Sequence, residues 1–129
     1  MTEIGLEATG VSVSLTVNDL GASLMWYRDV LGFAVEREFE RAGVPFALRM
    51  RAGSVALLLT QESGARGAQR VKGEGFSIRF TTTQNVDALA TRAKAHGAAL
   101  ESEPADGWGA RVFRLRDPDG FLLVISSER

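Results

Sequence analysis

Arg79 is the residue whose type and position most clearly predict chemistry. It lies in an alternating run, 76–81; as a strand, this run places Arg79 on one face with Ser77 and Thr81, while the other face is apolar. A guanidinium carries a permanent charge and is costly to bury without a partner. Arg79 is therefore expected to meet a ligand anion, an acidic side chain or water. The sequence leaves open whether it binds an anionic ligand or makes a structural ion pair.

Trp108 is the second candidate for ligand binding. It stands between Gly107 and Gly109 at the entrance of a predicted strand, 111–115. An indole in this place can stack on a planar ligand, or it can cap the edge of the core. Arg111, at the start of the same strand, can contact a ligand or extend along the surface with its charge in water.

The composition excludes several kinds of site. The chain has no cysteine, which removes disulfides, thiolate metal ligands and cysteine nucleophiles. Its single histidine, His96, ends a predicted helix, and one histidine is too few for a histidine metal centre. A Ser/His/Asp triad is not expected either, because Ser12 and Ser77 have no base beside them in the sequence. We therefore predict no catalytic residue.

Charge and hydropathy limit the partners. The 129 residues carry a formal net charge of −1, which gives no electrostatic reason to expect nucleic acid or an anionic membrane as a partner. No apolar run approaches the roughly 18 residues of a membrane span, and the first residues lack the basic-then-apolar order of a secretory signal. A cytoplasmic protein is expected.

A hairpin from Trp108 to Ile125 organises the second half of the chain. Its turn, Asp117-Pro118-Asp119-Gly120, has a proline that presets φ and a glycine that accepts a positive φ. The second arm, 121–125, is apolar on both faces. Such a strand must lie inside a sheet, with a helix covering one face.

The chain repeats one pattern of elements. A strand, a helix and three more strands are predicted in each half, and equivalent residues such as Leu24 and Leu89, or Gly32 and Gly97, stand 65 residues apart. We therefore predict an α+β fold of two βαβββ modules within one domain, 1–129, with curved mixed sheets around a cleft and helices outside. The predicted parts are module one at 10–62, a glycine-rich linker at 63–74 and module two at 75–127. The expected strands are 11–17, 33–39, 46–51, 55–60, 76–81, 99–103, 111–115 and 121–126, and the expected helices are 20–31 and 86–96.

Four segments resemble those of a known family. They are VNDL at 17–20, WYRDVLGF at 26–33, WG at 108–109 and DPDGF at 117–121. Together they resemble the vicinal oxygen chelate superfamily, which groups glyoxalase I, the bleomycin resistance proteins and the extradiol dioxygenases. The resemblance implies the same tandem fold, but not one activity, because several chemistries share this scaffold.

The resemblance also implies where a metal would be held. Family enzymes bind a divalent metal with one side chain from the first strand and one from the last strand of each module, and these positions fall here at Ser12, Leu58, Ser77 and Val124. Neither a serine hydroxyl nor an aliphatic chain supplies the nitrogen or carboxylate donor that such a metal needs. A shift of one residue in either direction reaches only apolar residues. The chain thus resembles a metal-free member, and no cofactor is expected.

The preferred interpretation is a binding protein of the bleomycin-resistance type, with a role in antibiotic resistance. It would sequester a small amphipathic or aromatic molecule, and family members commonly dimerise, so a homodimer is expected; Met25 and Trp26 lie off the core stripe of their helix. Arg49, Arg51, Arg114 and Arg116 are assigned to a solvated face opposite the cleft. The predicted ligand-binding residues are Ser12, Phe46, Leu48, Met50, Leu58, Ser77, Arg79, Trp108, Arg111, Phe113 and Val124.

Two alternatives remain open. The protein could be a lyase or dioxygenase with a non-standard metal site, or a diverged module that serves only as a partner or regulator. Carboxylates for a non-standard site would come from Glu36, Glu38, Glu101, Glu103 and Asp106.

Overall fold

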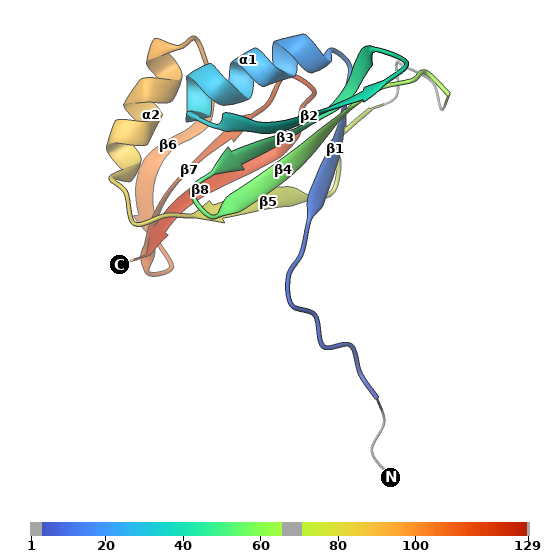
Figure 1. Ribbon diagram of the computed structural model, residues 1–129. Helices are drawn as coiled ribbons and strands as arrows, with labels where there is room; N and C mark the ends of the chain where they lie inside the picture. Colours follow the sequence, from blue (N-terminus) through green and yellow to red (C-terminus); the bar gives the residue numbers. More distant parts are fainter. Residues whose placement is uncertain (1–3, 66–70, 129) are drawn as a thin grey trace.

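The computed structural model describes residues 4–65 and 71–128. The chain forms two successive units with the same order of elements, strand, helix and three strands (Figure 1). Module 1 comprises β1 (Val13–Val17), α1 (Leu20–Leu31), β2 (Ala34–Arg41), β3 (Val44–Ala52) and β4 (Val55–Gln61). Module 2 comprises β5 (Ser77–Thr81), α2 (Val86–Ala95), β6 (Leu100–Gly107), β7 (Ala110–Arg116) and β8 (Leu122–Glu128).

Each module contains a four-stranded mixed sheet. The strand orders are β1-β4-β3-β2 in sheet A and β5-β8-β7-β6 in sheet B, with one parallel pair in each, β1 with β4 and β5 with β8. The predicted tandem βαβββ fold is confirmed. Within the described residues the two sheets stay separate and do not close into a barrel.

The helices begin and end where their caps predict. Asp19 accepts a hydrogen bond from the Ala22 amide at 3.0 Å and starts α1, and Asn85 does the same for Ala88 at the start of α2. Gly32 ends α1 at φ 80°, a conformation that glycine adopts without strain. These short-range signals explain why the helix boundaries agree with the sequence prediction within one residue.

One face of each sheet packs against the helix of its own module. In sheet A, Leu48 pairs with Leu59 and Met50 with Leu57 on the face covered by α1. In sheet B, Phe113 is buried in the same way on the helix side. The prediction that Leu48, Met50 and Phe113 line the cleft is therefore wrong. Successive strand residues point to opposite faces, and these large apolar side chains occupy the face that the helices cover.

The two modules are joined through the turn between β7 and β8. The Tyr27 hydroxyl of α1 donates a 2.7 Å hydrogen bond to buried Asp117, and the Asn18 amide donates to Asp119 at 2.8 Å. Burial raises the pKa of the Asp117 carboxyl, although hydrogen bonds from Tyr27, Phe121 and Asp119 act in the opposite direction. Module 2 therefore holds α1, at Tyr27 and at Asn18 just before the helix begins, through carboxylates that its turn sequence supplies.

The linker is attached to module 1 by a buried ion pair. Lys72 Nζ lies 3.0 Å from a carboxylate oxygen of Glu62, and both side chains are about 95 % buried, with exposures of 5 % and 6 %. Lys72 also donates to the side chain of Asn18 at 2.8 Å. Residues 66–70 of the predicted linker lie outside the described part of the chain.

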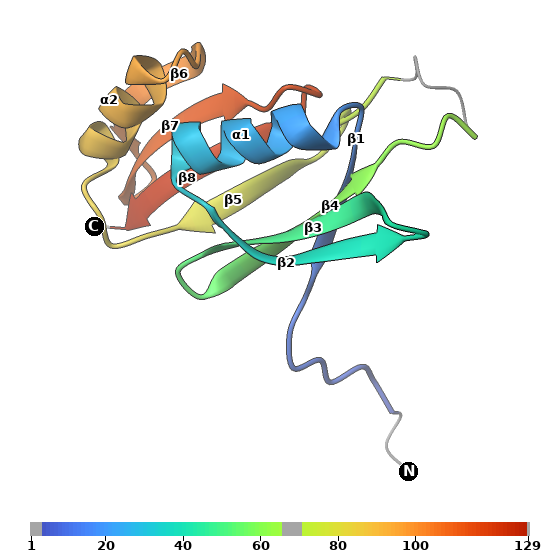
Figure 2. The same cartoon turned by 45° about the horizontal axis from the view of Figure 1, so that its top comes forward.

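The N-terminal segment ahead of β1 runs away from the body of the molecule, whereas both helices lie together on one side (Figures 1 and 2). Ile4, Leu6 and Val11 in this segment are exposed. Among the described residues, no helix has the length and apolar character that a membrane crossing requires.

Candidate functional site

The candidate site is the face of sheet B that α2 does not cover, here called the open face of sheet B. Strand pairing builds its central row from three neighbouring strands, with Arg79 of β5 opposite Val124 of β8, and Val124 opposite Arg114 of β7. Paired residues in a sheet point to the same side. Two guanidinium side chains therefore flank one valine.

Arg79 lies on the open face, as the alternation of its strand predicts. Its guanidinium donates a 2.8 Å hydrogen bond to the hydroxyl of Ser126, a residue with no exposed surface. The nearest carboxylate oxygen, from exposed Glu128, is 3.9 Å away. The Arg79 side chain remains 48 % exposed. It is thus oriented by a buried hydroxyl but only weakly neutralised.

Arg114 belongs to the same face, so its assignment to a solvated surface opposite the cleft is wrong. The residues of β7 alternate as predicted, but the two faces are the reverse of the prediction: the helix covers the apolar face with Phe113 and Leu115, and Arg114 lies on the open side. The same exchange applies in sheet A, where Arg49 pairs with Leu58 on the open side. Arg114 has no hydrogen-bond or ion-pair partner among the described residues.

A pocket of about 260 Å³ lies at one end of this face, next to the β6–β7 hairpin. Trp108 forms the tip of the hairpin at φ 53° and is fully exposed. The pocket is lined by Arg79, Ser102, Glu103, Ala105, Asp106, Gly107, Trp108, Val112 and Arg114. It therefore combines an aromatic ring and aliphatic surface with two guanidiniums.

The carboxylates that line this pocket already have cationic partners. The Lys94 ammonium lies 2.9 Å from a carboxylate oxygen of Glu103, and the Arg111 guanidinium lies 3.1 Å from a carboxylate oxygen of Asp106. Arg111 also forms two hydrogen bonds with Asp87, at 2.6 and 2.8 Å, and these contacts raise its pKa. The structure thus places Arg111 in an ion-pair network, which differs from both roles that the sequence suggested, ligand contact and a surface charge in water.

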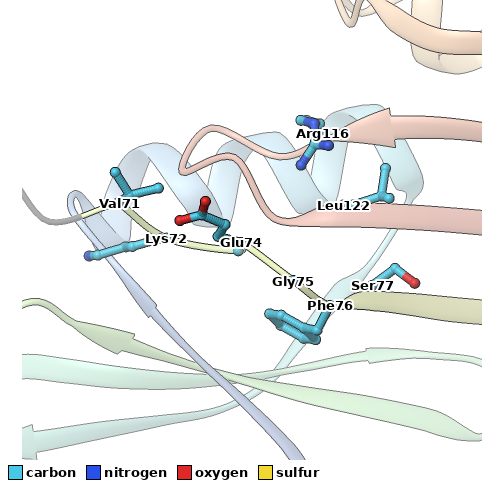
Figure 3. Close-up of a pocket in the computed structure, with 9 residues that line it drawn as sticks. Val71, Lys72, Glu74, Gly75, Phe76, Ser77, Arg116 and Leu122 are labelled. Atoms are coloured by element: carbon cyan, nitrogen blue, oxygen red, sulfur yellow. The ribbon is translucent and has the colours of Figure 1, made fainter.

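A second, larger cavity of about 590 Å³ opens at the other end of the open face of sheet B. The strap 71–76 borders it, together with Ser77, Leu122 and Arg116 (Figure 3). Arg116 is tied to Glu101 at 3.1 Å and to the Gly120 carbonyl at 2.9 Å. Lys72 extends away from Arg116 and Leu122 (Figure 3) toward its partners in module 1.

The four positions that correspond to the family's metal ligands do not supply a donor set. Ser12 is exposed ahead of β1 and Ser77 is exposed on β5, whereas Leu58 and Val124 are aliphatic. Leu58 pairs with Ser14 just as Val124 pairs with Arg79, which makes them equivalent in the repeat. No group of three or more His, Cys, Asp or Glu residues that could hold a metal occurs in residues 4–65 and 71–128.

Four of the carboxylates considered for a non-standard metal site are ion-paired. Glu103 and Asp106 bind the cations described above, Glu36 binds Arg51 at 3.0 Å, and Glu101 binds Arg116 at 3.1 Å. A metal would have to displace these cations. The lyase or dioxygenase alternative gains no support from them.

The predicted ligand-binding residues do not come together within one chain. Ser12, Leu58 and Phe46 belong to module 1, where Phe46 lies beside a different cavity and stacks under the Arg41 guanidinium at 4.6 Å. Ser77, Arg79, Trp108 and Val124 belong to the open face or the rim of sheet B. The predicted ligand-binding residues do not include Arg114, Ser126 and Val112, although an assignment of the apolar face of β7 to the core places Arg114 and Val112 on the open face.

Comparison with known proteins supports the resemblance found in the sequence. The family model described as the Glyoxalase/Bleomycin resistance protein/Dioxygenase superfamily matches residues 10–125. YraH, an uncharacterized protein of Bacillus subtilis (strain 168), is 31 % identical over 127 residues, covering 89 % of this chain and 94 % of YraH.

Solved structures share the fold at lower identity. TnmS3, an antibiotic binding protein from Streptomyces sp. CB03234, is 19 % identical with a TM-score of 0.75, covering 95 % of this chain and 100 % of TnmS3. TioX from Micromonospora sp. ML1 is also 19 % identical, with a TM-score of 0.76 and coverage of 95 % and 100 %. The family match extends over nearly the whole sequence, and the chain belongs to the glyoxalase/bleomycin resistance protein/dioxygenase superfamily.

Proposed function

We propose that this protein is a metal-independent binding protein that sequesters a small amphipathic or aromatic molecule on the open face of sheet B. The observation that carries the proposal is the row Arg79–Val124–Arg114, in which an aliphatic residue occupies a family metal-ligand position and charged side chains flank it. The antibiotic-binding description of TnmS3 supports a binding role for this scaffold.

Trp108 would supply the aromatic contact. Its φ of 53° is unfavourable for a bulky side chain, and its fully exposed ring does not pack in the core. Exposed tryptophan at the rim of a pocket provides a large apolar surface for a planar ligand.

Arg79 would bind an acidic group of the ligand. Its hydrogen bond to Ser126 fixes the guanidinium beside Val124, where a carboxylate could accept a charge-assisted hydrogen bond. An aromatic acid would then lie with its body toward Trp108 and Val112 and its carboxylate at Arg79.

A homodimer would cover the faces of sheets A and B that the helices of one chain leave uncovered. Ser14 and Thr16 of sheet A and Ser77 and Arg79 of sheet B face away from the helices of their own modules. A second copy could cover one or both open faces and enclose the ligand between subunits. Sedimentation at micromolar protein is expected to give twice the mass of a chain of 13.9 kDa.

Thermal shift with matched ligands tests the binding function. A series of aromatic acids and their amides should raise the unfolding midpoint of the wild type, with or without a chelator and without added zinc, nickel, manganese or iron. Arg79→Met should weaken the acids by about 1.5 to 3 kcal/mol and spare the amides, following the contribution of a hydrogen bond to a charged group. A saturable rise at micromolar metal, or no response to any aromatic compound, would contradict the proposal.

A further inference from the structure

The two guanidiniums on the central row of sheet B can reach one ligand group. Arg79 and Arg114 lie on the strands to either side of β8, so their Cα atoms are about 10 Å apart, two spacings of neighbouring strands. Between them Val124 is only 5 % exposed, as expected for a residue flanked by two long side chains. Both charges can therefore converge over the valine.

These two arginines differ from the other arginines of module 2 in their partners. Arg111 binds Asp87 and Asp106, Arg116 binds Glu101, and Arg92 donates to backbone carbonyls of α1. Arg114 has no such partner in residues 4–65 and 71–128, and Arg79 has a neutral hydroxyl at 2.8 Å and an exposed carboxylate only at 3.9 Å.

The acidic residues beside the pair do not cancel its charge. Glu103 is 2.9 Å from Lys94, and Asp106 is 3.1 Å from Arg111. The central row is thus left with an excess of positive charge on a surface that also contains aliphatic Val112 and the exposed ring of Trp108.

We propose that Arg79 and Arg114 form a two-guanidinium site that selects the phosphoryl group of an aromatic phosphate monoester. This inference rests on the proposed binding function and names its ligand class. A guanidinium presents a planar fork of N–H donors, and one carboxylate with two oxygens satisfies one fork. A phosphate monoester offers three terminal oxygens and a charge near −2, so it can accept from both forks at once.

Three naphthyl ligands test the selection by titration in a buffer free of phosphate. Naphthyl phosphate should bind the wild type about 10- to 100-fold more tightly than naphthoate, the factor that corresponds to an added charged hydrogen bond. Naphthamide should bind more weakly than naphthoate. Inorganic phosphate alone should compete with naphthyl phosphate for the guanidiniums.

Arg114→Met should remove the preference for phosphate and leave naphthoate binding within about threefold. Arg79→Met should weaken both anions, and Arg79→Lys, which keeps a charge without the fork, should retain naphthoate better than naphthyl phosphate. The matched control is Arg49→Met, because Arg49 holds the equivalent place in module 1, opposite Leu58, and should leave the preference unchanged.

A second readout is the pH dependence of binding. The second ionisation of a phosphate monoester lies near pH 6, so its affinity for the wild type should rise between pH 5 and 8, and Arg114→Met should flatten that rise. Naphthoate, already ionised, should not show it. The charged groups near the row are Arg79, Arg114, Arg116, Glu103, Asp106 and Glu128, and the only histidine of the chain lies at the end of α2.

The outcomes separate this inference from the function beneath it. Equal affinity for naphthyl phosphate and naphthoate, or an unchanged ratio in Arg114→Met, overturns the two-guanidinium site while leaving a binding protein for aromatic acids. An equal loss of preference in Arg49→Met also overturns it, because the effect would not be local to the pair. Failure of all three naphthyl ligands to bind overturns the proposed function itself.

Discussion

Modules 1 and 2 have the same framework. The salt bridge between Glu36 and Arg51 in module 1 recurs as Glu101 with Arg116 in module 2, each pair 15 residues apart in the sequence. Both modules also connect their second and third strands by a two-residue turn with positive φ at both positions, Ala42-Gly43 and Trp108-Gly109. This surface ion pair and this turn are therefore duplicated along with the order of elements.

The open faces have diverged. In module 1, Arg49 lies 5.5 Å and Arg37 4.7 Å from the ring of Phe39, so these guanidiniums are engaged by an aromatic side chain of their own sheet. In module 2, Arg114 has no such contact with any residue that the structure describes, and tryptophan replaces the small residue of the equivalent turn. The difference indicates that module 1 uses its charges to stabilise itself, whereas module 2 leaves its charges available.

The largest expected effect compares two equivalent carboxylates. Leu58 and Val124 are equivalent, which makes Glu62 the counterpart of Glu128 four residues farther along each chain segment. Glu62→Gln leaves Lys72 as a buried cation without its carboxylate and should lower the free energy of unfolding by about 3 kcal/mol. Glu128→Gln, in an exposed position, should change it by less than about 0.5 kcal/mol. Urea unfolding measures both.

The double variant Glu62→Gln/Lys72→Met serves as the control for this prediction. Removing the second charge should restore part of the lost stability, since the unpaired cation causes most of the penalty. If Glu62→Gln and Glu128→Gln both changed the free energy of unfolding by the same small amount, Glu62 would not have the structural role in module 1 that distinguishes it from exposed Glu128 in module 2.

The fold could be predicted because its determinants are local. Asp19 and Gly32 define α1, Asn85 defines the start of α2, and period-2 alternation locates the strands. The sequence repeat also predicts the same order of elements in both halves, so each half supports the assignment of the other. Strand ends were less predictable, as β6 continues to Gly107, beyond the expected end at residue 103.

The site was only partly predictable because its residues depend on which face of each strand is covered. A strand pattern gives two faces but does not label them, and the assignment of Arg114 and Phe113 failed at this step. Arg79 was placed correctly, since the apolar residues of β5 clearly formed the other face. The ion pairs of Arg111 with Asp87 and Asp106 join elements far apart in the sequence, which no local spacing could reveal.

A smaller effect is expected from the two equivalent turns. Asparagine tolerates positive φ better than alanine or tryptophan, so Ala42→Asn and Trp108→Asn should each raise the free energy of unfolding by roughly 0.5 kcal/mol. Only Trp108→Asn should weaken binding of an aromatic ligand, by about 1.5 kcal/mol, because it removes the exposed ring. Calorimetry on both variants measures the two quantities. Comparable losses of affinity would show that the ring of Trp108 has no special role.

The smallest expected effect is a pH dependence that belongs to the turn of module 2 alone. Asp117 is buried there, and its counterpart 65 residues earlier is Ala52. Burial raises the pKa of Asp117 in the folded state above its ordinary value of 3.8. In the pH window between the ordinary pKa and the raised pKa, the folded state therefore binds more protons than the unfolded state. The stability that Asp117 confers must then increase as pH falls through this window and decrease as pH rises through it.

Replacing Asp117 by a residue that does not titrate isolates this dependence. The stability of the wild type relative to Asp117→Asn should increase as the pH is lowered from 7 toward 4, and urea unfolding at several pH values measures the difference. The hydroxyl of Tyr27 donates to the ionised carboxylate at 2.7 Å and lowers the pKa of Asp117, in opposition to burial. Tyr27→Phe should therefore extend the window to higher pH, whereas Tyr27→Phe/Asp117→Asn should lose this dependence. A difference that decreases on acidification would mean that hydrogen bonding to the carboxylate outweighs the cost of burying it.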